Sequence, residues 1–376
     1  MPAVISETDR LHLERALELA ERGRGRVSPN PLVGAVIVRD GEVIGEGWHA
    51  ELGGLHAERA ALEDCRARGH DPAGATVFVT LEPCAHHGRQ PPCADALVEA
   101  RVARVVYAAD DPSEKASGRG PGILRDEGIE VIAADGPQAS AARLQNQAFR
   151  KHARTGRPLV TYKAATTLDG RTATATGDSK WISGARSREL VHRWRSEADA
   201  VAVGVGTALA DDPLLTARDG GPYARQPLRV VFDSQARLPL DAQLVRSLEV
   251  APLLVVAGAE APAERTAALR EAGADVVVVP GQRAERVKAA LAELGRREIT
   301  SVLLEGGATL AGAFLDAGEI DELRLFVAPK LLGGGDARPL LAGTGAERVA
   351  EALPALALAS ERSGEDILIK ARFREW

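Results

Sequence analysis

The sequence is poor in cysteine, with only three in 376 residues. An odd number of cysteines cannot pair completely, which argues against the disulfide framework of a small secreted protein. Residues 1–10 lack the apolar core of a signal peptide. The longest apolar run, near residues 250–259, is far too short to span a bilayer. We therefore expect a cytoplasmic protein without a membrane partner.

An excess of positive charge is also missing, since 47 basic residues stand against 53 acidic ones and the net charge is −6. A protein that binds nucleic acid normally carries a basic stripe, so we expect a small-molecule substrate and no nucleic acid partner. Aromatic residues make up only 3% of the chain, which predicts cores of small aliphatic side chains. The length exceeds that of one ordinary core and predicts two domains.

In the first part of the chain, apolar runs alternate with helical apolar periodicity. Ser6 through Asp9 resembles a capping box that begins a helix, and Asp40-Gly41 is a typical hairpin turn. Such alternation indicates an α/β layered domain. The pattern predicts helices at residues 6–22, 56–68 and 95–100, and strands at residues 33–38, 43–47, 76–81 and 104–109.

The polar and basic segment 144–158, which ends in Thr155-Gly156-Arg157-Pro158, is a candidate domain boundary. We therefore expect one domain at residues 1–150 and another at residues 151–376. The alternation resumes after the boundary. It predicts strands at residues 159–165, 200–204, 228–232, 253–256, 275–279, 301–304 and 322–327, and helices at residues 185–197, 261–272, 284–294 and 309–317.

His56, Cys84 and Cys93 have the chemistry of a zinc site. One imidazole and two thiolates supply three ligands and leave a fourth position open to water. A structural zinc is normally closed by a fourth protein ligand, whereas hydrolytic chemistry needs the open position. His86 and His87 lie in the same loop and are alternative ligands, although the first three residues suffice. The ligand set predicts a catalytic zinc in the first domain.

Glu58 lies two residues after His56, at the expected start of a helix. From there its carboxylate can take a proton from the attacking water and deliver protons to a ring nitrogen and to the leaving ammonia. A His-x-Glu followed by Pro-Cys and a second Cys marks zinc nucleobase deaminases, although eight residues separate Cys84 from Cys93 here. The pattern indicates a deaminase of an amino-pyrimidine or similar heterocycle. Cys65 has no partner motif and is expected to be a packing residue.

The second part of the chain has two glycine-containing turns after predicted strands, Gly204-Val205-Gly206-Thr207 and Leu304-Glu305-Gly306-Gly307. Backbone N–H groups at a helix start bind phosphate well, and glycine lets the backbone approach a ligand closely. Neither turn completes G-x-G-x-x-G, so a Rossmann site is not indicated. On the residues alone, a phosphate site and ordinary tight turns both remain open.

Taken together, these residues resemble the bifunctional deaminase–reductases of riboflavin biosynthesis over nearly the whole chain. The first half resembles them in Ser28-Pro29-Asn30-Pro31, in Gly54-x-His56-Ala57-Glu58 and in the stretch from Glu82 to Cys93 with its long His/Gly/Pro insert. The second half resembles them in Leu168-Asp169-Gly170, Trp181-Ile182, Asp211-Asp212-Pro213 and Leu304-Glu305-Gly306-Gly307.

The resemblance implies a cytidine-deaminase-like three-layer α/β domain followed by a dihydrofolate-reductase-like α/β domain. It implies a zinc-dependent deaminase at residues 1–150 and an NADPH-dependent reductase at residues 151–376. The deaminase would remove the 2-amino group of a diamino-ribosylamino-pyrimidinone 5′-phosphate by hydrolysis, and the reductase would then convert the ribosyl group to ribityl. Soluble enzymes of this kind are commonly symmetric, so we expect a homodimer or homotetramer.

The resemblance also implies contacts in each site. In the first site, substrate contacts would be Asn30, His49, His86, Arg89 and Asp111. In the second site, NADPH contacts would be Ala165, Trp181, Thr207, Asp211, Ser234, Gly307, Ala308, Thr309, Leu310, Ala311, Gly312 and Ala313. Substrate contacts there would be Ser179, Arg195, Leu215, Arg218 and Glu305.

Physical chemistry adds two expectations for the second site. Arg195 and Arg218 suit a phosphate clamp. Lys163, late in the first predicted strand of its domain, could offer its ammonium to the opened sugar. A plainer interpretation stays open, in which Glu305 caps a helix and Lys163 pairs with it.

The sequence departs from the family pattern at three positions. Ser113 stands where the family usually has Asn, Thr167 where it has Ser, and Gln90 where it has Thr. None of these changes removes a metal ligand or Glu58. Two other functions remain as alternatives: a zinc deaminase of another amino-heterocycle with an unrelated second domain, and a zinc-stabilised scaffold without activity.

Overall fold

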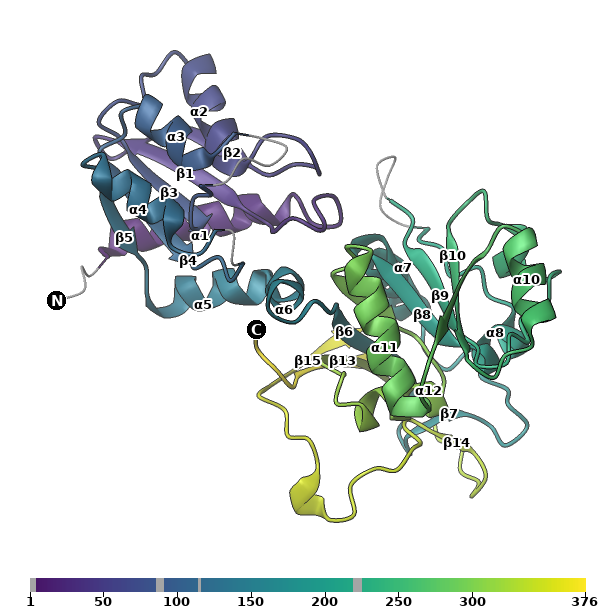
Figure 1. Ribbon diagram of the computed structural model, residues 1–376. Coiled ribbons are helices and arrows are strands. Elements are labelled where there is room, and N and C mark those ends of the chain that lie inside the picture. Colours follow the sequence, from purple (N-terminus) through teal and green to yellow (C-terminus); the bar gives the residue numbers. More distant parts are fainter. Residues whose placement is uncertain (1–4, 86–90, 114–115, 219–224) are drawn as a thin grey trace. The chain divides into compact units, whose positions relative to one another are not determined.

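The computed structural model describes residues 5–85, 91–113, 116–218 and 225–376 (Figure 1). The chain forms two compact units, Met1–Thr155 together with Trp376, and Gly156–Glu375. The chain passes from one unit to the other inside the segment where the sequence suggests a boundary. Among the described helices, none has the length and apolar character needed to cross a membrane.

The first unit contains a five-stranded sheet in the order β2-β1-β3-β4-β5. β1 is antiparallel to β2 and β3, whereas β3, β4 and β5 are parallel. The β1–β2 pair is the hairpin that Asp40-Gly41 predicts, and both turn residues take a positive φ, 53° and 82°. The strands are β1 (Gly34–Arg39), β2 (Glu42–Trp48), β3 (Thr76–Leu81), β4 (Arg104–Ala109) and β5 (Glu130–Ala133).

Helices cover both faces of this sheet and complete three layers. Val77 and Val79 of β3 pack with one group of helices, and Phe78 between them packs on the opposite face. This alternation follows from the two-residue period of a strand. The first face carries α2 (Ala57–Ala67), α3 (Cys93–Glu99) and α4 (Arg119–Asp126), and the other carries α1 (Glu7–Glu21) and α5 (Gly136–Gln145).

The sixth helix of the first unit, α6 (Gln147–Thr155), carries the residues that hold Trp376. The Trp376 backbone N–H donates to Gln147 Oε1 at 2.8 Å, and Arg150 Nε donates to the Trp376 carbonyl at 2.7 Å. Arg150 also donates to the Asp110 carbonyl at 2.7 Å. These bonds explain why the last residue belongs to the first unit.

The second unit contains a nine-stranded sheet in the order β11-β10-β9-β8-β12-β6-β13-β16-β15. Neighbouring strands are parallel from β11 to β13, and β16 and β15 add an antiparallel edge. Its strands are β6 (Leu159–Thr167), β8 (Ala200–Gly204), β9 (Leu228–Phe232), β10 (Leu253–Gly258), β11 (Asp275–Val279), β12 (Ser301–Leu304), β13 (Glu322–Ala328), β15 (Ala357–Ser363) and β16 (Asp366–Arg372), and a separate pair joins β7 (Arg171–Ala173) to β14 (Arg338–Pro339).

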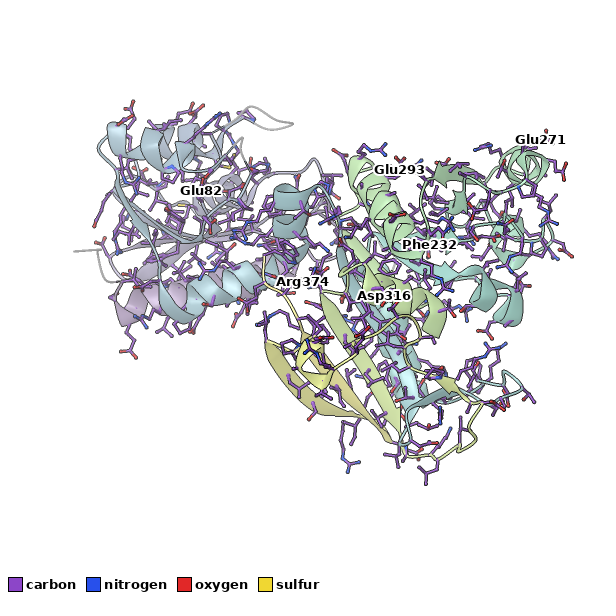
Figure 2. The ribbon with its side chains drawn as sticks, turned by 60° about the horizontal axis from the view of Figure 1, so that its bottom comes forward. Glu82, Phe232, Glu271, Glu293, Asp316 and Arg374 are labelled. Atoms are coloured by element: carbon purple, nitrogen blue, oxygen red, sulfur yellow. The ribbon has the colours of Figure 1, made fainter. Side chains whose placement is uncertain are left out.

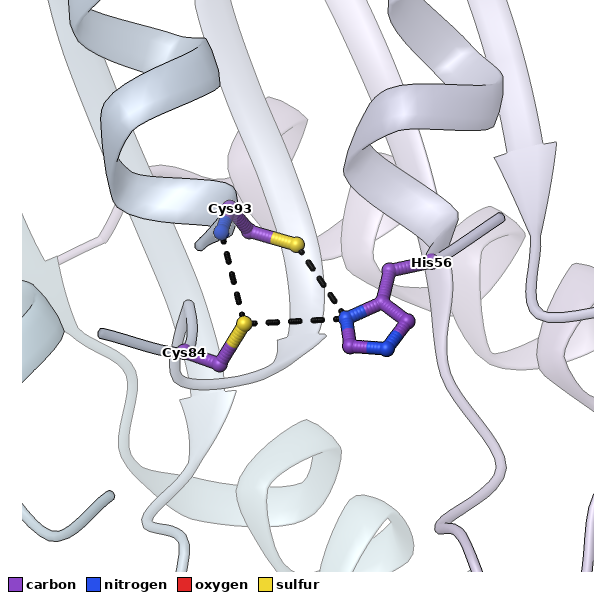
Figure 3. Close-up of side chains that lie close together, drawn as sticks. All are labelled: His56, Cys84 and Cys93. Carbon is purple, nitrogen blue, oxygen red and sulfur yellow. Dashed lines mark hydrogen bonds between the residues drawn. The ribbon is translucent and has the colours of Figure 1, made fainter. Parts of the chain in front are cut away.

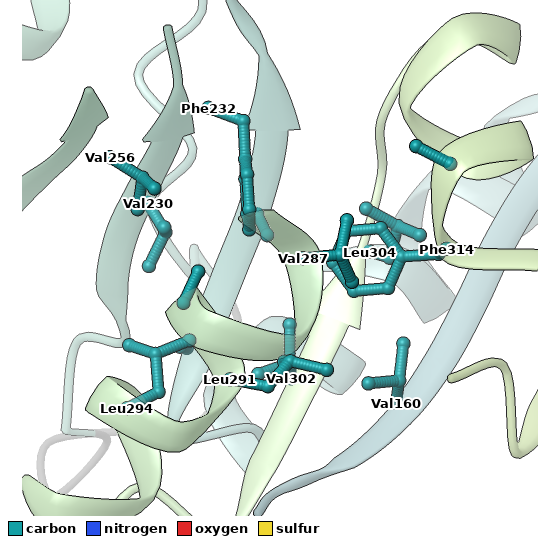
Figure 4. Packing of buried hydrophobic residues seen from close by; sticks show 14 of the residues in the cluster. Val160, Val230, Phe232, Val256, Val287, Leu291, Leu294, Val302, Leu304 and Phe314 are labelled. Atoms are coloured by element: carbon teal, nitrogen blue, oxygen red, sulfur yellow. The ribbon is translucent and has the colours of Figure 1, made fainter. Parts of the chain in front are cut away.

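Helices also cover both faces of the nine-stranded sheet. On one face, Val287 and Phe314 of two helices pack against Val230, Phe232 and Leu304 of the strands (Figure 4). Most members of this core cluster are Val, Leu and Ala, as the low aromatic content predicts. The helices are α11 (Arg283–Arg296) and α12 (Ala308–Asp316) on this face, α7 (Ala185–Glu197), α8 (Val205–Asp211), α9 (Gln243–Arg246) and α10 (Ala263–Glu271) on the other, and a 3-10 turn at Val349–Glu351.

Several elements are absent from the sequence-based prediction. They are α4, β5, α5, α6, β7, α8, α9, β14, β15 and β16. β15 lacks the strand signal because every residue except Ser363 is at least partly exposed, so no alternation of burial marks it. In β16, Asp366, Leu368 and Ala371 are buried without a strict alternation, and the apolar run Ile367-Leu368-Ile369 was the available signal.

The start of α1 depends on Asp9, which also joins this helix to β4. The Ser6 hydroxyl accepts from the Asp9 N–H at 3.1 Å, and Asp9 Oδ2 accepts from the Ser6 N–H at 2.9 Å, which confirms the predicted capping box. Arg104 donates to both oxygens of the Asp9 carboxylate at 2.8 and 2.9 Å. The Arg104 hydrogen bonds lower the pKa of Asp9 to about 2.

We predict that Asp9→Asn destabilises the protein by about 2 kcal/mol above pH 4. Because the pKa of Asp9 is depressed in the folded state, its stabilisation is present above the usual carboxyl pKa and is lost as the pH falls towards 2. Urea unfolding of both proteins between pH 2 and pH 6 measures the difference. An equal difference at pH 2 and pH 6 would contradict the assignment of the shift to Asp9.

Candidate active sites

Three separate elements bring the predicted metal ligands together in the first unit. His56 is the N-cap of α2, and its side chain makes no capping hydrogen bond. Cys84 follows β3, and Cys93 is the first residue of α3. The imidazole therefore points to the two sulfurs, with His56 Nδ1 at 3.6 Å from Cys84 Sγ and 3.4 Å from Cys93 Sγ (Figure 3).

These distances fit a zinc ion. Bonds of about 2.3 Å to sulfur and about 2.0 Å to nitrogen at tetrahedral angles place a sulfur and a nitrogen ligand roughly 3.5 Å apart. All three ligand atoms lie within 4.8 Å of one another. The alternative ligands His86 and His87 lie outside the described residues. The donor set and its spacing therefore suit zinc without a further protein ligand.

Glu58 lies in the first turn of α2 and is only 3% exposed. Burial raises the pKa of its carboxyl group to about 7, and the negative charge of the Cys84 thiolate acts in the same direction. Hydrogen bonds from the Cys93 thiol and from His56 lower the pKa of Cys84 to about 4. The site thus combines an easily ionised thiol with a carboxyl group that exchanges protons near neutral pH.

A fixed imidazole lies beside the metal ligands. His49 is buried, and its ring packs edge-to-face with His56 at 5.4 Å between centroids. His49 Nδ1 lies 2.9 Å from the Leu55 carbonyl, which can only accept, so Nδ1 carries a proton. Burial lowers the pKa of His49 and favours the neutral ring. Its Nε2 then accepts from the Asn30 amide at 3.1 Å, which leaves Asn30 Oδ1 as an acceptor for a substrate.

The remaining predicted contacts of the first site divide into two groups. His86 and Arg89 lie outside the described residues, as does Gln90. Asp111 is buried, and its Oδ1 accepts from the Ser113 backbone N–H at 2.8 Å. Because this bond uses the backbone of Ser113, the departure from Asn at that position does not affect it.

Glu82 is a residue that the sequence-based prediction does not assign to the site. Glu82, labelled in Figure 2, is buried, and its carboxylate accepts from the Gly118 N–H at 2.7 Å and from the Asp111 N–H. Gly118 is the N-cap of α4. Glu82, two residues before Cys84, therefore binds the backbone both at Asp111 and at the start of α4. Its position directly before Pro83-Cys84 was the available signal. Cys65 lies in the core cluster, as expected for a packing residue.

Candidate contacts of the second unit lie at the carboxyl ends of adjacent parallel strands. Ala165 lies near the end of β6, Ser234 follows β9, and Glu305 follows β12. Thr207 lies in α8, which begins directly after β8. The strands β6, β12, β8 and β9 are neighbours in the sheet, so these residues share one edge. Such an edge is where open α/β sheets usually bind ligands.

A buried ion pair lies at this edge. Both carboxylate oxygens of Glu305 accept from Arg195, at 2.6 and 2.9 Å, and Arg195 also donates to the Thr216 carbonyl at 3.2 Å. Burial lowers the pKa of Lys163, while the charge of nearby Glu305 opposes this effect. Arg195 is therefore paired with Glu305. The phosphate clamp of Arg195 and Arg218 stays a prediction.

The plainer interpretation of Glu305 holds only in part, since Glu305 caps no helix but does interact electrostatically with Lys163. The N-cap of α12 is Gly307, without a side-chain capping bond, and the ion-pair partner of Glu305 is Arg195. Although burial acts in the opposite direction, Arg195 holds the pKa of Glu305 below its usual value. Glu305, Arg195 and Lys163 form one charged cluster.

The turn after β12 lies against the start of α8. A Cβ added to Gly307 would lie 3.4 Å from the Thr207 hydroxyl, so these two predicted contacts are neighbours. The later residues of the predicted stretch are placed differently. Ala311 and Ala313 are buried, and a Cβ on Gly312 would collide with the Ala342 carbonyl. These later residues pack α12 into the unit, whereas Ala308, Thr309 and Leu310 remain partly or fully exposed.

Trp181, Ser179 and Asp211 lie in neighbouring segments. The Trp181 side chain is 64% exposed, and the Arg188 guanidinium lies 4.7 Å from its ring centre. Lys180 lies 4.0 Å from the Asp211 carboxylate, which places this segment beside the end of α8.

The segment after α8 holds the last two predicted contacts. Leu215 is buried with a φ of 54°, and Arg218 is exposed.

The fully buried Arg229 donates to the Leu214 carbonyl at 3.3 Å and to the Ser247 hydroxyl at 2.7 Å. Arg229 was not predicted to have this role, although an arginine inside an apolar strand was a visible signal.

Thr167 keeps the bonds that a serine would make. Its hydroxyl donates to Asp169 Oδ1 at 2.6 Å and accepts from the Arg171 N–H at 3.1 Å. Serine carries the same donor and acceptors, so the departure from the family pattern preserves both interactions.

Two family models match different parts of the chain. The model of the cytidine and deoxycytidylate deaminase zinc-binding region matches residues 6–109. The model of the RibD C-terminal domain matches residues 158–369. The first match contains His56, Glu58, Cys84 and Cys93, and the second contains the charged cluster.

Curated relatives match almost the full length. The riboflavin biosynthesis protein RibD of Actinobacillus pleuropneumoniae is 41% identical, over 96% of this chain and 94% of its own. The protein of the same name from Escherichia coli K12 is 42% identical, over 92% of this chain and 94% of its own.

Solved structures agree with these matches. RibD from Acinetobacter baumannii superimposes with a TM-score of 0.87 at 39% identity, covering 98% of this chain and 99% of that one. A diaminohydroxyphosphoribosylaminopyrimidine deaminase/5-amino-6-(5-phosphoribosylamino)uracil reductase from Thermotoga maritima gives 0.84 at 36% identity, covering 98% and 99%. The expected fold class, a cytidine-deaminase-like domain followed by a dihydrofolate-reductase-like domain, is confirmed.

We predict that Cys84→Ser binds zinc at least about 100-fold more weakly than the unchanged protein, because even changes behind the ligands cost about 10- to 100-fold in affinity. Cys65→Ser is the matched control, since Cys65 packs in the core. Elemental analysis after dialysis should find about one zinc per chain in the unchanged protein and the control. Full zinc retention in Cys84→Ser would refute the ligand assignment.

Proposed function

The chain belongs to the family of bifunctional deaminase–reductases of riboflavin biosynthesis, and from this premise we propose how its residues carry the two reactions. Its cofactors are zinc and NADPH. The first unit hydrolyses the 2-amino group of 2,5-diamino-6-ribosylamino-4(3H)-pyrimidinone 5′-phosphate, and the second reduces the ribosyl group to ribityl. The observation that carries the proposal is the meeting of His56, Cys84 and Cys93 beside the buried Glu58.

In the first reaction, His56, Cys84 and Cys93 would hold the zinc, and the zinc would supply a water that is a good nucleophile near neutral pH. Glu58 takes a proton from the attacking water and passes protons to the ring nitrogen and to the departing amine. A general acid–base is most effective when its pKa lies near the working pH, and burial brings the pKa of Glu58 to about 7.

Recognition of the pyrimidinone depends on groups with fixed hydrogen-bonding roles. With its Nδ1 proton directed to Leu55, His49 holds the Asn30 amide so that Asn30 Oδ1 can accept from an amino or hydroxyl group of the substrate. Asp111 is a further contact, held by the Glu82 carboxylate through its backbone. His86 and Arg89 complete the proposed substrate set.

In the second reaction, bound NADPH would supply the hydride that reduces C1′ of the sugar, and a residue of the chain would supply the proton that the ring oxygen gains as the C1′–O4′ bond opens. Lys163 is the proposed proton donor, because burial lowers its pKa and makes its ammonium a stronger acid. Arg195 keeps Glu305 ionised at its side. The other proposed substrate contacts are Ser179, Arg195, Leu215, Arg218 and Glu305.

NADPH would lie across the carboxyl ends of the parallel strands. Its proposed contacts there are Ala165, Thr207, Asp211, Ser234 and the turn at Gly307. The exposed Trp181 offers an aromatic surface to the cofactor. The stretch Ala308–Ala313 takes part through its first residues, since Ala311 and Ala313 face the interior.

We also infer a homo-oligomer in the cytoplasm. β15 is an edge strand with Leu358 71% exposed, and Ile367 on the adjacent β16 is 44% exposed. A second copy of the chain could cover this apolar edge, which would otherwise be open to unspecific pairing. Three free cysteines, two of them in the metal centre, suit a reducing compartment.

Two observations disfavour the alternatives. A deaminase with an unrelated second domain does not explain a RibD C-terminal domain match over residues 158–369. An inactive zinc scaffold does not need a buried carboxyl group two residues from one of its metal ligands.

We predict that Glu58→Gln retains zinc and releases ammonia about 100- to 10,000-fold more slowly, because the amide keeps the shape of the side chain but cannot carry protons. Reduction of the deaminated substrate should continue at the unchanged rate, since it takes place in the other unit. Metal analysis and separate assays of ammonia and NADPH check all three results.

The control for this experiment is Glu63→Gln, which changes a carboxylate on the same helix without entering the site. Deamination by Glu58→Gln at nearly the rate of the control would disprove the proton-transfer role. Loss of zinc from Glu58→Gln would show instead that Glu58 belongs to the metal ligands.

A further inference from the structure

The segment Trp181–Ser183 precedes α7, and two cationic side chains donate hydrogen bonds to its carbonyl groups. Lys330 Nζ donates to the Trp181 carbonyl at 2.7 Å and to the Ile182 carbonyl at 3.0 Å. The segment belongs to no strand, and its Ile182 N–H donates to the nearby Ser179 carbonyl at 3.2 Å. Contacts with the rest of the unit therefore come in part from side chains.

The second of these cations is Arg188, on α7. Its guanidinium lies 4.7 Å from the centre of the Trp181 ring, and its Nη1 donates to the Ser183 carbonyl at 2.7 Å. Lys330 and Arg188 thus bind successive carbonyl groups of one short segment, and Arg188 also stacks on its indole. Together they restrict both the backbone and the ring.

Lys330 is itself held in place by the Leu168-Asp169-Gly170 turn. The Lys330 carbonyl accepts from the Leu168 N–H at 2.9 Å. The Asp169 carboxylate accepts from the backbone N–H groups of Leu332 at 3.1 Å and Gly333 at 2.8 Å. The Thr167 hydroxyl, which hydrogen-bonds to Asp169, is the main cause that lowers the pKa of Asp169 to about 2, so this carboxylate stays ionised. A rigid turn therefore supports the lysine.

We propose that Lys330 is a positioning residue of the reductase site, which holds the Trp181 indole in the orientation that receives NADPH. The inference rests on the proposed function, because the contact between Trp181 and NADPH belongs to it. Lys330 acts only through the backbone of the Trp181 segment. Through these contacts, Lys330 links the motif Leu168-Asp169-Gly170 to the Trp181 segment of the proposed cofactor site.

The expected effect follows from the cost of ordering a loop. Hydrogen bonds from an ammonium to carbonyl groups are stronger than neutral ones, and without them the segment samples more conformations. NADPH must then select the competent fraction, and its apparent affinity falls by that fraction. Lys330 is exposed, so its replacement should leave the fold intact.

The test compares Lys330→Met, which keeps the aliphatic stem, with Lys330→Arg, which keeps the positive charge and N–H donors. Lys288→Met, an exposed lysine on α11 of the same unit, is the matched control. Calorimetric titration of the full-length protein with NADPH should show about tenfold weaker binding for Lys330→Met. Lys330→Arg should recover most of this loss, and the melting temperature and ammonia release should stay unchanged in all variants.

Binding by Lys330→Met with the affinity of the unchanged protein would overturn the inference. So would weaker binding that Lys330→Arg does not recover, since the ammonium hydrogen bonds would then not be the cause. Trp181→Ala separates this inference from the proposed function. If the unchanged protein does not bind NADPH, or if Trp181→Ala binds it equally well, the assignment of Trp181 to the cofactor site fails instead.

Discussion

Three ligand atoms from three separate elements have to meet within 4.8 Å, and the first unit is arranged around that requirement. His56 can reach the cysteines only if α2 lies close on β2. Gly47 permits this, since a Cβ there would come within 2.3 Å of the Ala61 backbone nitrogen. Near Cys84, the backbone of Gly120 in α4 lies so close to the Pro83 carbonyl that a Cβ on Gly120 would collide with it. Close backbone contacts at glycines thus hold the ligand-bearing segments.

The two units use a buried carboxylate in opposite ways. Among the described residues, Glu58 forms no ion pair, and burial raises its pKa to about 7. Glu305 is paired with Arg195, which keeps its pKa low and its charge permanent. In the proposed mechanism, the environment, rather than the residue type, makes Glu58 a proton carrier and Glu305 a fixed charge. This contrast matches hydrolysis in one site and hydride transfer in the other.

The sequence allowed accurate predictions where the chemistry is local. Short motifs contain the metal ligands His56, Cys84 and Cys93 together with Glu58, and most strands of both sheets are apolar runs. The sequence therefore predicts the candidate metal site and most strands. Long-range pairings between side chains have no comparable sequence signal. The partner of Glu305 lies 110 residues away at Arg195, and the partner of Glu82 lies 36 residues away at Gly118. Such contacts depend on how the strands are ordered in the sheet, which residue spacing does not reveal.

The central claim is that one chain performs a zinc-dependent deamination and then an NADPH-dependent reduction in separate sites. The most direct test supplies the purified protein with the diamino-pyrimidinone phosphate and follows ammonia and NADPH separately. The account predicts ammonia release without NADPH, and consumption of NADPH only after deamination, one molecule for each ammonia. Removal of zinc should stop both signals, and deaminated substrate should restore NADPH oxidation alone. Oxidation of NADPH by the diamino substrate without ammonia release would contradict the account.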